Sequence, residues 1–128
     1  MTLRIVRLGT PRLAKEGTRI GAVRRPPRGV RKEQWATGDW FDVWYPDLSP
    51  SPEQVSRARA ALTQDEWDSF VRAFRAEMEA PTPRRALDLL AALSHDADFS
   101  VGCYCEDEAR CHRSVLRALL AERGAALD

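Results

Sequence analysis

The 128-residue chain has few of the residues that mark secreted or membrane proteins. It holds only three cysteines, and an odd number argues against a framework of disulfides. It has no run of about 20 apolar residues that could cross a membrane, and its first residues lack the apolar segment of a signal peptide. These absences predict a cytoplasmic protein with no membrane partner, whose cysteines are thiols or ligands rather than bridges.

The length predicts a single α/β domain over residues 1–128. Short β-rich runs predict strands at 3–8, 18–23, 41–45 and 99–105. Capping residues and apolar spacings of three and four predict helices at 52–61, at 64–79, from 82 onward and at 108–123. Strands distributed among helices favour a compact three-layer α/β domain, in which helices flank a small, mainly parallel sheet.

Basic residues are concentrated in the first third of the chain. Residues 1–36 contain ten Lys and Arg but only two acids, whereas the remainder contains ten basic and seventeen acidic residues. The segment 19–32 holds no acid at all, and within it Arg24, Arg28, Arg31 and Lys32 are candidates for binding an anion. Two interpretations stay open: an anionic partner, or a solvated loop that pairs with the protein's own acidic C-terminal part.

Residues 103–112 contain all three cysteines and one of the two histidines. Cys103, Cys105, Cys111 and His112 are ligand types for zinc, but no C-x2-C knuckle is present. Adjacent residues diverge by about 100° on a helix, so no metal site is predicted. A rhodanese-type loop from Cys105 to Arg110 is disfavoured by the three acids that it contains.

The remaining interpretation of this segment is a thiol beside a basic patch. If Cys111 lies in the first turn of a helix, the unpaired backbone N–H groups there favour its thiolate form. Cys103, on the inward face of a strand, is expected to be core packing.

Several motifs together resemble the domain-of-unknown-function 488 (DUF488) family, including its YeaO-like branch. They are the basic segment Arg24 to Lys32, the stretch Trp44 to Ser51, the apolar positions from Trp67 to Met78, and the triplet Cys111-His112-Arg113. The resemblance implies a Rossmann-like sheet, a basic P-R-G loop and a Cys-His-Arg helix. It implies no established activity and no identified cofactor.

By matching position, Arg24, Arg28 and Gly29 fall on the loop motif of that family, and Cys105, Cys111, His112 and Arg113 fall on its thiol motif. The chain departs from the YeaO-like pattern at Val23, where an acid is usual, and at Pro26, where Trp is usual. Any pairing of that acid with a loop arginine is therefore absent here.

Ligands of open parallel sheets bind at the carboxyl ends of the strands. The loops that follow three predicted strands would then bring one set of side chains to a single cleft: Arg24, Arg28, Asp47, Cys105, Cys111 and His112. The alternative is that Arg28 pairs with Asp47 or Glu106 and only locks the loops together.

Two functions follow. The first is an anion-binding protein with a thiol-containing cleft, acting on a small phosphorylated or carboxylated metabolite or a nucleotide. Cys105 or Cys111 would supply the thiol, and His112 would act as its base or orient it. The second is a non-catalytic module that binds nucleic acid or protein through the Arg-rich loop, Trp35 and Trp40. The sequence pI of about 7.8 favours the small anion over nucleic acid, and whether the protein is an enzyme stays open.

Overall fold

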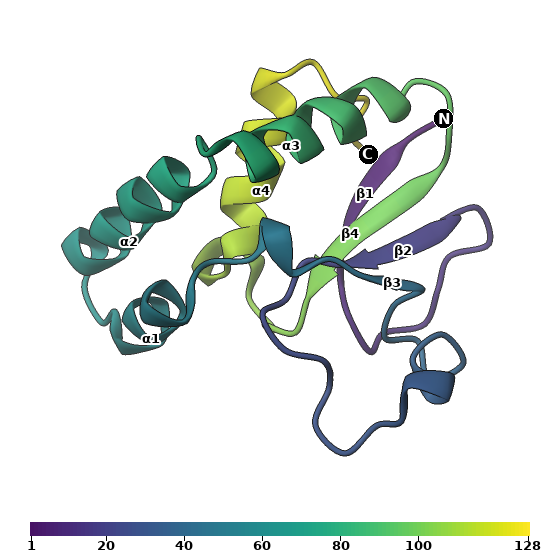
Figure 1. Ribbon diagram of the computed structural model, residues 1–128, viewed down its shortest axis with the longest axis horizontal. Helices are drawn as coiled ribbons and strands as arrows, with labels where there is room; N and C mark the ends of the chain where they lie inside the picture. The colour runs from purple at the N-terminus through teal and green to yellow at the C-terminus, as the bar shows by residue number, and fades with distance from the viewer.

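The fold is built around a small parallel sheet. The computed structural model describes residues 1–128 and contains four strands: β1 (Leu3–Arg7), β2 (Thr18–Gly21), β3 (Val43–Trp44) and β4 (Phe99–Cys103). They lie in the order β1-β4-β2-β3, and every neighbouring pair is parallel (Figure 1). The predicted α/β class with a parallel sheet is confirmed, and β4, the last strand in the chain, lies between β1 and β2.

Four α-helices follow from local signals in the sequence. They are α1 (Pro52–Ala60), α2 (Gln64–Glu77), α3 (Pro81–Leu93) and α4 (His112–Glu122). The connecting segments contain three short 3-10 helices: η1 (Lys32–Gln34), η2 (Pro46–Leu48) and η3 (Glu108–Arg110). The hydroxyl of Ser51 accepts from the Gln54 amide and starts α1, with Pro52 at the first helical position. No helix has both the length and the apolar character needed to cross a membrane.

The main apolar core lies between the helices and one face of the sheet. Phe99 and Val101 of β4 are buried on this face together with Phe70 and Phe74 of α2 and Leu116 of α4. Burying one such side chain contributes about 1.5–3 kcal/mol. This core fixes the end of α4 that faces the cysteine segment.

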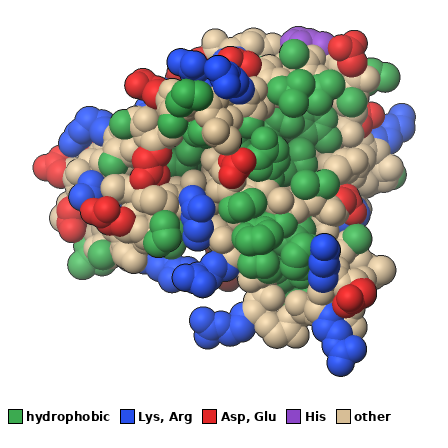
Figure 2. All heavy atoms as spheres, in the orientation of Figure 1, with side chains coloured by type: hydrophobic (Ala, Val, Ile, Leu, Met, Phe, Trp, Pro, Cys, Tyr) green, Lys and Arg blue, Asp and Glu red, His purple; other side chains and the backbone are tan.

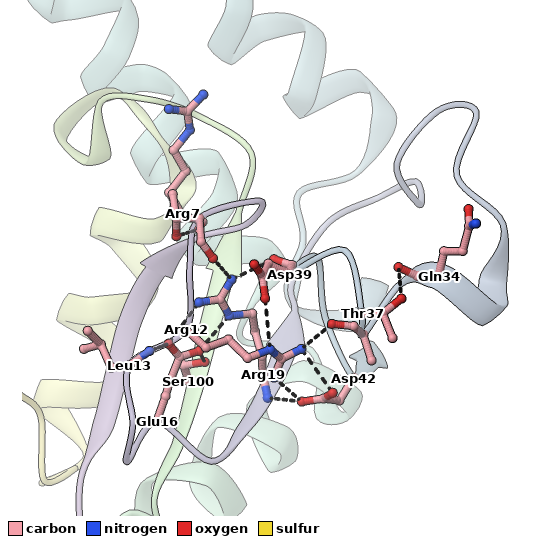
Figure 3. A network of polar contacts seen from close by, with 12 residues as sticks. Arg7, Arg12, Leu13, Glu16, Arg19, Gln34, Thr37, Asp39, Asp42 and Ser100 are labelled. Atoms are coloured by element: carbon pink, nitrogen blue, oxygen red, sulfur yellow. Dashed lines mark hydrogen bonds and ion pairs between the residues drawn. The ribbon is translucent and has the colours of Figure 1, made fainter.

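The opposite face of the sheet carries a buried polar network covered by loops. Side chains alternate along a strand, so Arg19 of β2 and Ser100 of β4 point away from the main core. Arg19 binds the carboxylate of Glu16 and the backbone carbonyls of Thr10 and Asp39, both in loops (Figure 3). The layer on this face is therefore made of loops held by arginine rather than of helices.

The predicted boundaries differ most in the cysteine segment. The strand predicted at 99–105 ends at Cys103, because the neighbouring strands end at Arg7 and Gly21 and leave no ladder partner beyond it. The helix predicted at 108–123 is interrupted: η3 is followed by Cys111, whose backbone is extended (φ −131°, ψ 150°), and α4 begins only at His112. The strand predicted at 41–45 shortens to β3.

Candidate functional site

The loops at the carboxyl edge of the sheet are tied to one another by backbone carbonyls. Arg24, just beyond β2, donates from Nε to the carbonyl of Pro50 (3.0 Å) and from Nη2 to that of Ser49 (3.1 Å), both in the segment that follows β3. Tyr104, just beyond β4, donates its hydroxyl to the carbonyl of Arg25 (2.9 Å). The parallel sheet therefore brings these three loops to one edge. Arg24 serves here as a clamp between two of them.

Two of the cysteines meet at this edge. Cys103 ends β4, Cys111 is the N-cap residue of α4, and their Sγ atoms are close enough to be joined as a disulfide. The two Cα atoms are 7.9 Å apart. Both side chains are buried in a small apolar cluster with Leu8, Val23 and Phe41. This pair is therefore shielded from solvent.

His112 points its second ring nitrogen at the two sulfurs. Its Nε2 lies 2.6 Å from the carbonyl of Ala22, and because a carbonyl only accepts, Nε2 carries the hydrogen. Nδ1 is then an unprotonated acceptor, 3.8 Å from the Sγ of Cys111. Burial is the largest cause that lowers the pKa of His112, to about 4, although the bond to Ala22 opposes it; the ring also meets that of Phe74 edge to face at 5.7 Å. The imidazole is neutral at pH 7.

The prediction that Cys111 lies in the first turn of a helix is wrong. Its backbone is extended, and its side chain makes no capping bond to the amides of α4. The expected help from the helix N-terminus is therefore missing. Side chains of adjacent residues diverge by about 100° only when both residues are helical. Because Cys111 is not helical, this divergence does not argue against a metal site here.

We call Cys103, Cys111 and His112 the thiol cluster. Cys105 and Arg113 lie apart from it. Cys105 is exposed and is the one free cysteine. Arg113 is 4% exposed; its Nη2 donates to the carbonyl of Cys105, and its Nε has no partner. The structure thus divides the predicted catalytic set into two pairs: buried Cys111 with partly buried His112, and Cys105 with Arg113, which reaches only the backbone of Cys105.

The basic loop, residues 24–32, carries cations that no acid neutralises. Arg25, Arg28, Arg31 and Lys32 are exposed, and none forms an ion pair or a side-chain hydrogen bond. By contrast, seven arginines elsewhere bind carboxylates: Arg4, Arg7, Arg12, Arg19, Arg75, Arg117 and Arg123.

The alternative that Arg28 forms an ion pair with Asp47 or Glu106 is also wrong. Glu106 binds Arg7 instead, at 3.7 Å, and Asp47 forms no ion pair. Gly29 has φ +75° with open space around it, so the loop turns there in a conformation that glycine adopts without strain.

Two surface hollows lie beside this loop. One has a volume of about 480 Å³ and is lined by a lysine, two acids and several apolar side chains: Lys32, Glu33, Trp35, Ala36, Phe41, Asp42, Val43 and Trp44. The other, of about 250 Å³, is lined by Arg24, Asp47, Ser49, Ser51, Glu77, Met78, Ala80, Thr82 and Pro83. Neither is lined by a cysteine or a histidine. Figure 2 shows basic side chains gathered near apolar ones along the lower edge of this face, where the basic loop lies in Figure 1.

Comparison with known proteins places these features in one family. The family model DUF488-N3a, described as the active DUF488-N3 subclade, matches residues 3–124. The chain belongs to the DUF488 family. The predicted family is thereby confirmed, and the match spans both the basic loop and the thiol cluster. Comparisons with curated proteins and with solved structures gave no match.

In this DUF488 chain, sequence reasoning missed the approach of Cys103 to Cys111, although it predicted that Cys103 is buried. Its place on the inward face of a strand is the pattern of core packing, and the sequence gives no sign that Cys111 would fold back onto it. The same applies to Ala22, whose carbonyl orients His112. A backbone group leaves no trace in residue type, so only the structure reveals this contact.

Proposed function

We propose that the protein binds a phosphate-bearing ligand, either a nucleotide or single-stranded nucleic acid, through the basic loop. The observation that carries this proposal is the set of four exposed, unpaired cations in the loop: Arg25, Arg28, Arg31 and Lys32. A guanidinium offers two parallel N–H donors to a phosphate. Unpaired arginines also occur on α1, but four unpaired cations within residues 25–32, a segment that contains no acid, favour an external anion.

The loop is held in place without using these cations. Arg24 and the hydroxyl of Tyr104 fix the start of the loop to the neighbouring loops, and Pro27 is buried. An anchored loop loses less conformational entropy when it binds a ligand. The cations can therefore contribute to affinity rather than to loop folding.

Aromatic side chains next to the loop supply a surface for a base. Trp44 is 38% exposed, and its ring meets that of Trp35 edge to face at 6.4 Å. Stacking a base on an aromatic side chain contributes about 1–3 kcal/mol. Glu33 and Asp42 also line this hollow and repel phosphates, which favours a base in the hollow and phosphates on the loop.

Fluorescence anisotropy with a short labelled oligothymidylate tests this proposal. Changing Arg28→Gln together with Arg31→Gln should weaken binding at least about tenfold and reduce the salt slope by about two, one for each phosphate contact. The matched control is Arg57→Gln with Arg59→Gln, which removes the same charge from two exposed, unpaired arginines on α1.

The same experiment separates the two ligands. If adenosine monophosphate competes as well as the oligonucleotide at equal phosphate concentration, the ligand is a mononucleotide; if only the oligonucleotide binds tightly, it is a polymer. Loss of affinity of the same size in both double variants would contradict the proposal, as would the absence of binding by either probe at low salt.

Thiol chemistry at Cys105 is the second candidate, as part of a cytoplasmic enzyme. The observation that favours it is exposure: Cys105 is free and exposed, and its neighbour Tyr104 binds the backbone of the basic loop. We expect iodoacetamide to modify Cys105 in the folded protein and the bound phosphate ligand to slow that reaction. Mass spectrometry of the alkylated peptides measures both, and an unchanged rate with ligand present would remove Cys105 from the site.

A further inference from the structure

We propose that Cys103, Cys111 and His112 form a binding site for a zinc ion at the base of the carboxyl edge. This inference is independent of the proposed function, because it concerns two buried cysteines and a partly buried histidine that the basic loop does not use. The observation that carries it is the convergence of two sulfurs and one ring nitrogen, all within 4.8 Å of one another. Thiolate and imidazole are the ligands that zinc prefers in proteins.

The orientation of His112 is that of a metal ligand. In metal sites, the histidine nitrogen that does not bind the ion usually donates its hydrogen to a carbonyl or carboxylate. Here Nε2–H donates to the carbonyl of Ala22, which directs the lone pair of Nδ1 toward the sulfurs. A histidine that only filled the core would not need an unprotonated nitrogen facing two thiols.

The backbone geometry favours a metal over a disulfide between the same cysteines. Disulfides join Cα atoms that are usually about 4.4–6.8 Å apart, whereas those of Cys103 and Cys111 are 7.9 Å apart.

Neither backbone is free to approach the other. The carbonyl of Cys103 accepts from Leu8 (2.8 Å), and Cys111 bonds through its amide to Glu108 (3.1 Å) and through its carbonyl to Ser114 (3.0 Å). Two Zn–S bonds of about 2.3 Å each span a longer gap than one S–S bond of about 2.05 Å. An ion between the sulfurs therefore fits this backbone better than a direct bond.

The charge of the site matches a divalent ion. Binding releases one proton from each thiol to solvent, which leaves two thiolates and a neutral imidazole. A Zn²⁺ ion cancels the two negative charges, as an apolar surrounding of Leu8, Val23 and Phe41 requires. A monovalent copper ion would leave one charge buried. Three protein ligands also leave a fourth position on zinc, which a water or a substrate atom can take.

Metal analysis of the reduced protein tests the site. Protein purified with a phosphine reductant and no chelator should contain about one zinc per chain by mass spectrometry of the metal. Cys111→Ser and Cys103→Ser should each lose it, whereas the matched control Cys105→Ser should keep it. Circular dichroism of each variant checks that the fold is retained.

A second measurement does not depend on variants that fold. Wild-type protein, stripped of metal under reducing conditions, is titrated with Co²⁺, which should give the near-ultraviolet band of thiolate bound to cobalt and stop at one equivalent. Zinc should then displace the band. Failure of Co²⁺ to give a thiolate band, a preparation that holds copper in place of zinc, or a Cys103–Cys111 disulfide that persists in reductant would each overturn the proposal.

Discussion

Arg19 and Glu16 form the most completely buried ion pair in the molecule. Each side chain is 1% exposed. Nε and Nη2 of Arg19 donate to the two carboxylate oxygens at 2.6 and 2.9 Å, and the hydroxyl of Ser100 donates to the same carboxylate at 2.7 Å. Breaking one partner of such a pair leaves an uncompensated buried charge. The pair therefore holds β2, β4 and the covering loops in one arrangement.

The Glu16→Gln variant should be strongly destabilised. Removing one member of a buried pair costs about 3–5 kcal/mol, so urea unfolding at pH 7 should show a loss of that size. The exposed, unpaired Glu79→Gln serves as control and should change the free energy of unfolding by no more than about 0.5 kcal/mol. A loss in Glu16→Gln no larger than in the control would contradict this role.

The stability contribution of Glu16 also has a defined pH window. Burial raises the pKa of Glu16, but the bonds from Arg19, Ser100 and the Leu13 amide outweigh it and lower the pKa from 4.5 to about 2. A folded-state pKa below the unfolded one means that the contribution is complete above pH 4.5 and is lost as pH falls toward 2. The free energy of unfolding should therefore fall less steeply between pH 4.5 and 2 in Glu16→Gln than in the wild-type protein.

At the scale of elements, helix starts are determined locally. Thr63 and Glu66 form a reciprocal capping box at α2: the Thr63 hydroxyl accepts from the Glu66 amide, and the Glu66 carboxylate accepts from the Thr63 amide, both at 3.1 Å. The T-x-x-E pattern is visible in the sequence, and the predicted start of the helix is confirmed.

Removal of this cap should have a moderate effect. Thr63→Ala should cost about 1 kcal/mol of unfolding free energy, measured by urea denaturation, because the backbone amide of Glu66 loses its acceptor. Thr63→Ser keeps a hydroxyl at the same place and should restore most of that loss. If Ala and Ser behave alike, the hydroxyl is not what stabilises the start of α2.

Other element ends could not be predicted because they depend on neighbours in space. β4 ends at Cys103 only because its flanking strands end beside it. The extended backbone of Cys111 belongs to a segment in which η3 closes by its own bonds before α4 begins. Periodicity in one segment reports neither effect, and as a result the sequence placed Cys105 on a strand and Cys111 on a helix.

At the scale of the molecule, the class of the fold and the meeting of three loops at one edge could be predicted, because parallel strands present their carboxyl ends together. The strand order could not, since β4 pairs with β1 across 96 residues of chain at Leu3 and Phe99. Which arginines form ion pairs with acids also depends on contacts between residues that are distant in the chain. Arg117 binds Glu108, whereas Arg28 finds none, although both are arginines in a chain with nearly equal numbers of acids.

The basic loop holds five cations and no acid, and this gives the molecule an electric polarity that its net charge of +1 conceals. A nearly neutral body with a positive end experiences a torque in the field of a polyanion, so it turns loop-first before contact. Such orientation acts within roughly a Debye length, about 8 Å at physiological salt. Non-productive encounters on the acidic surface would then be rejected early, and the loop would select its partner during approach as well as in the bound state.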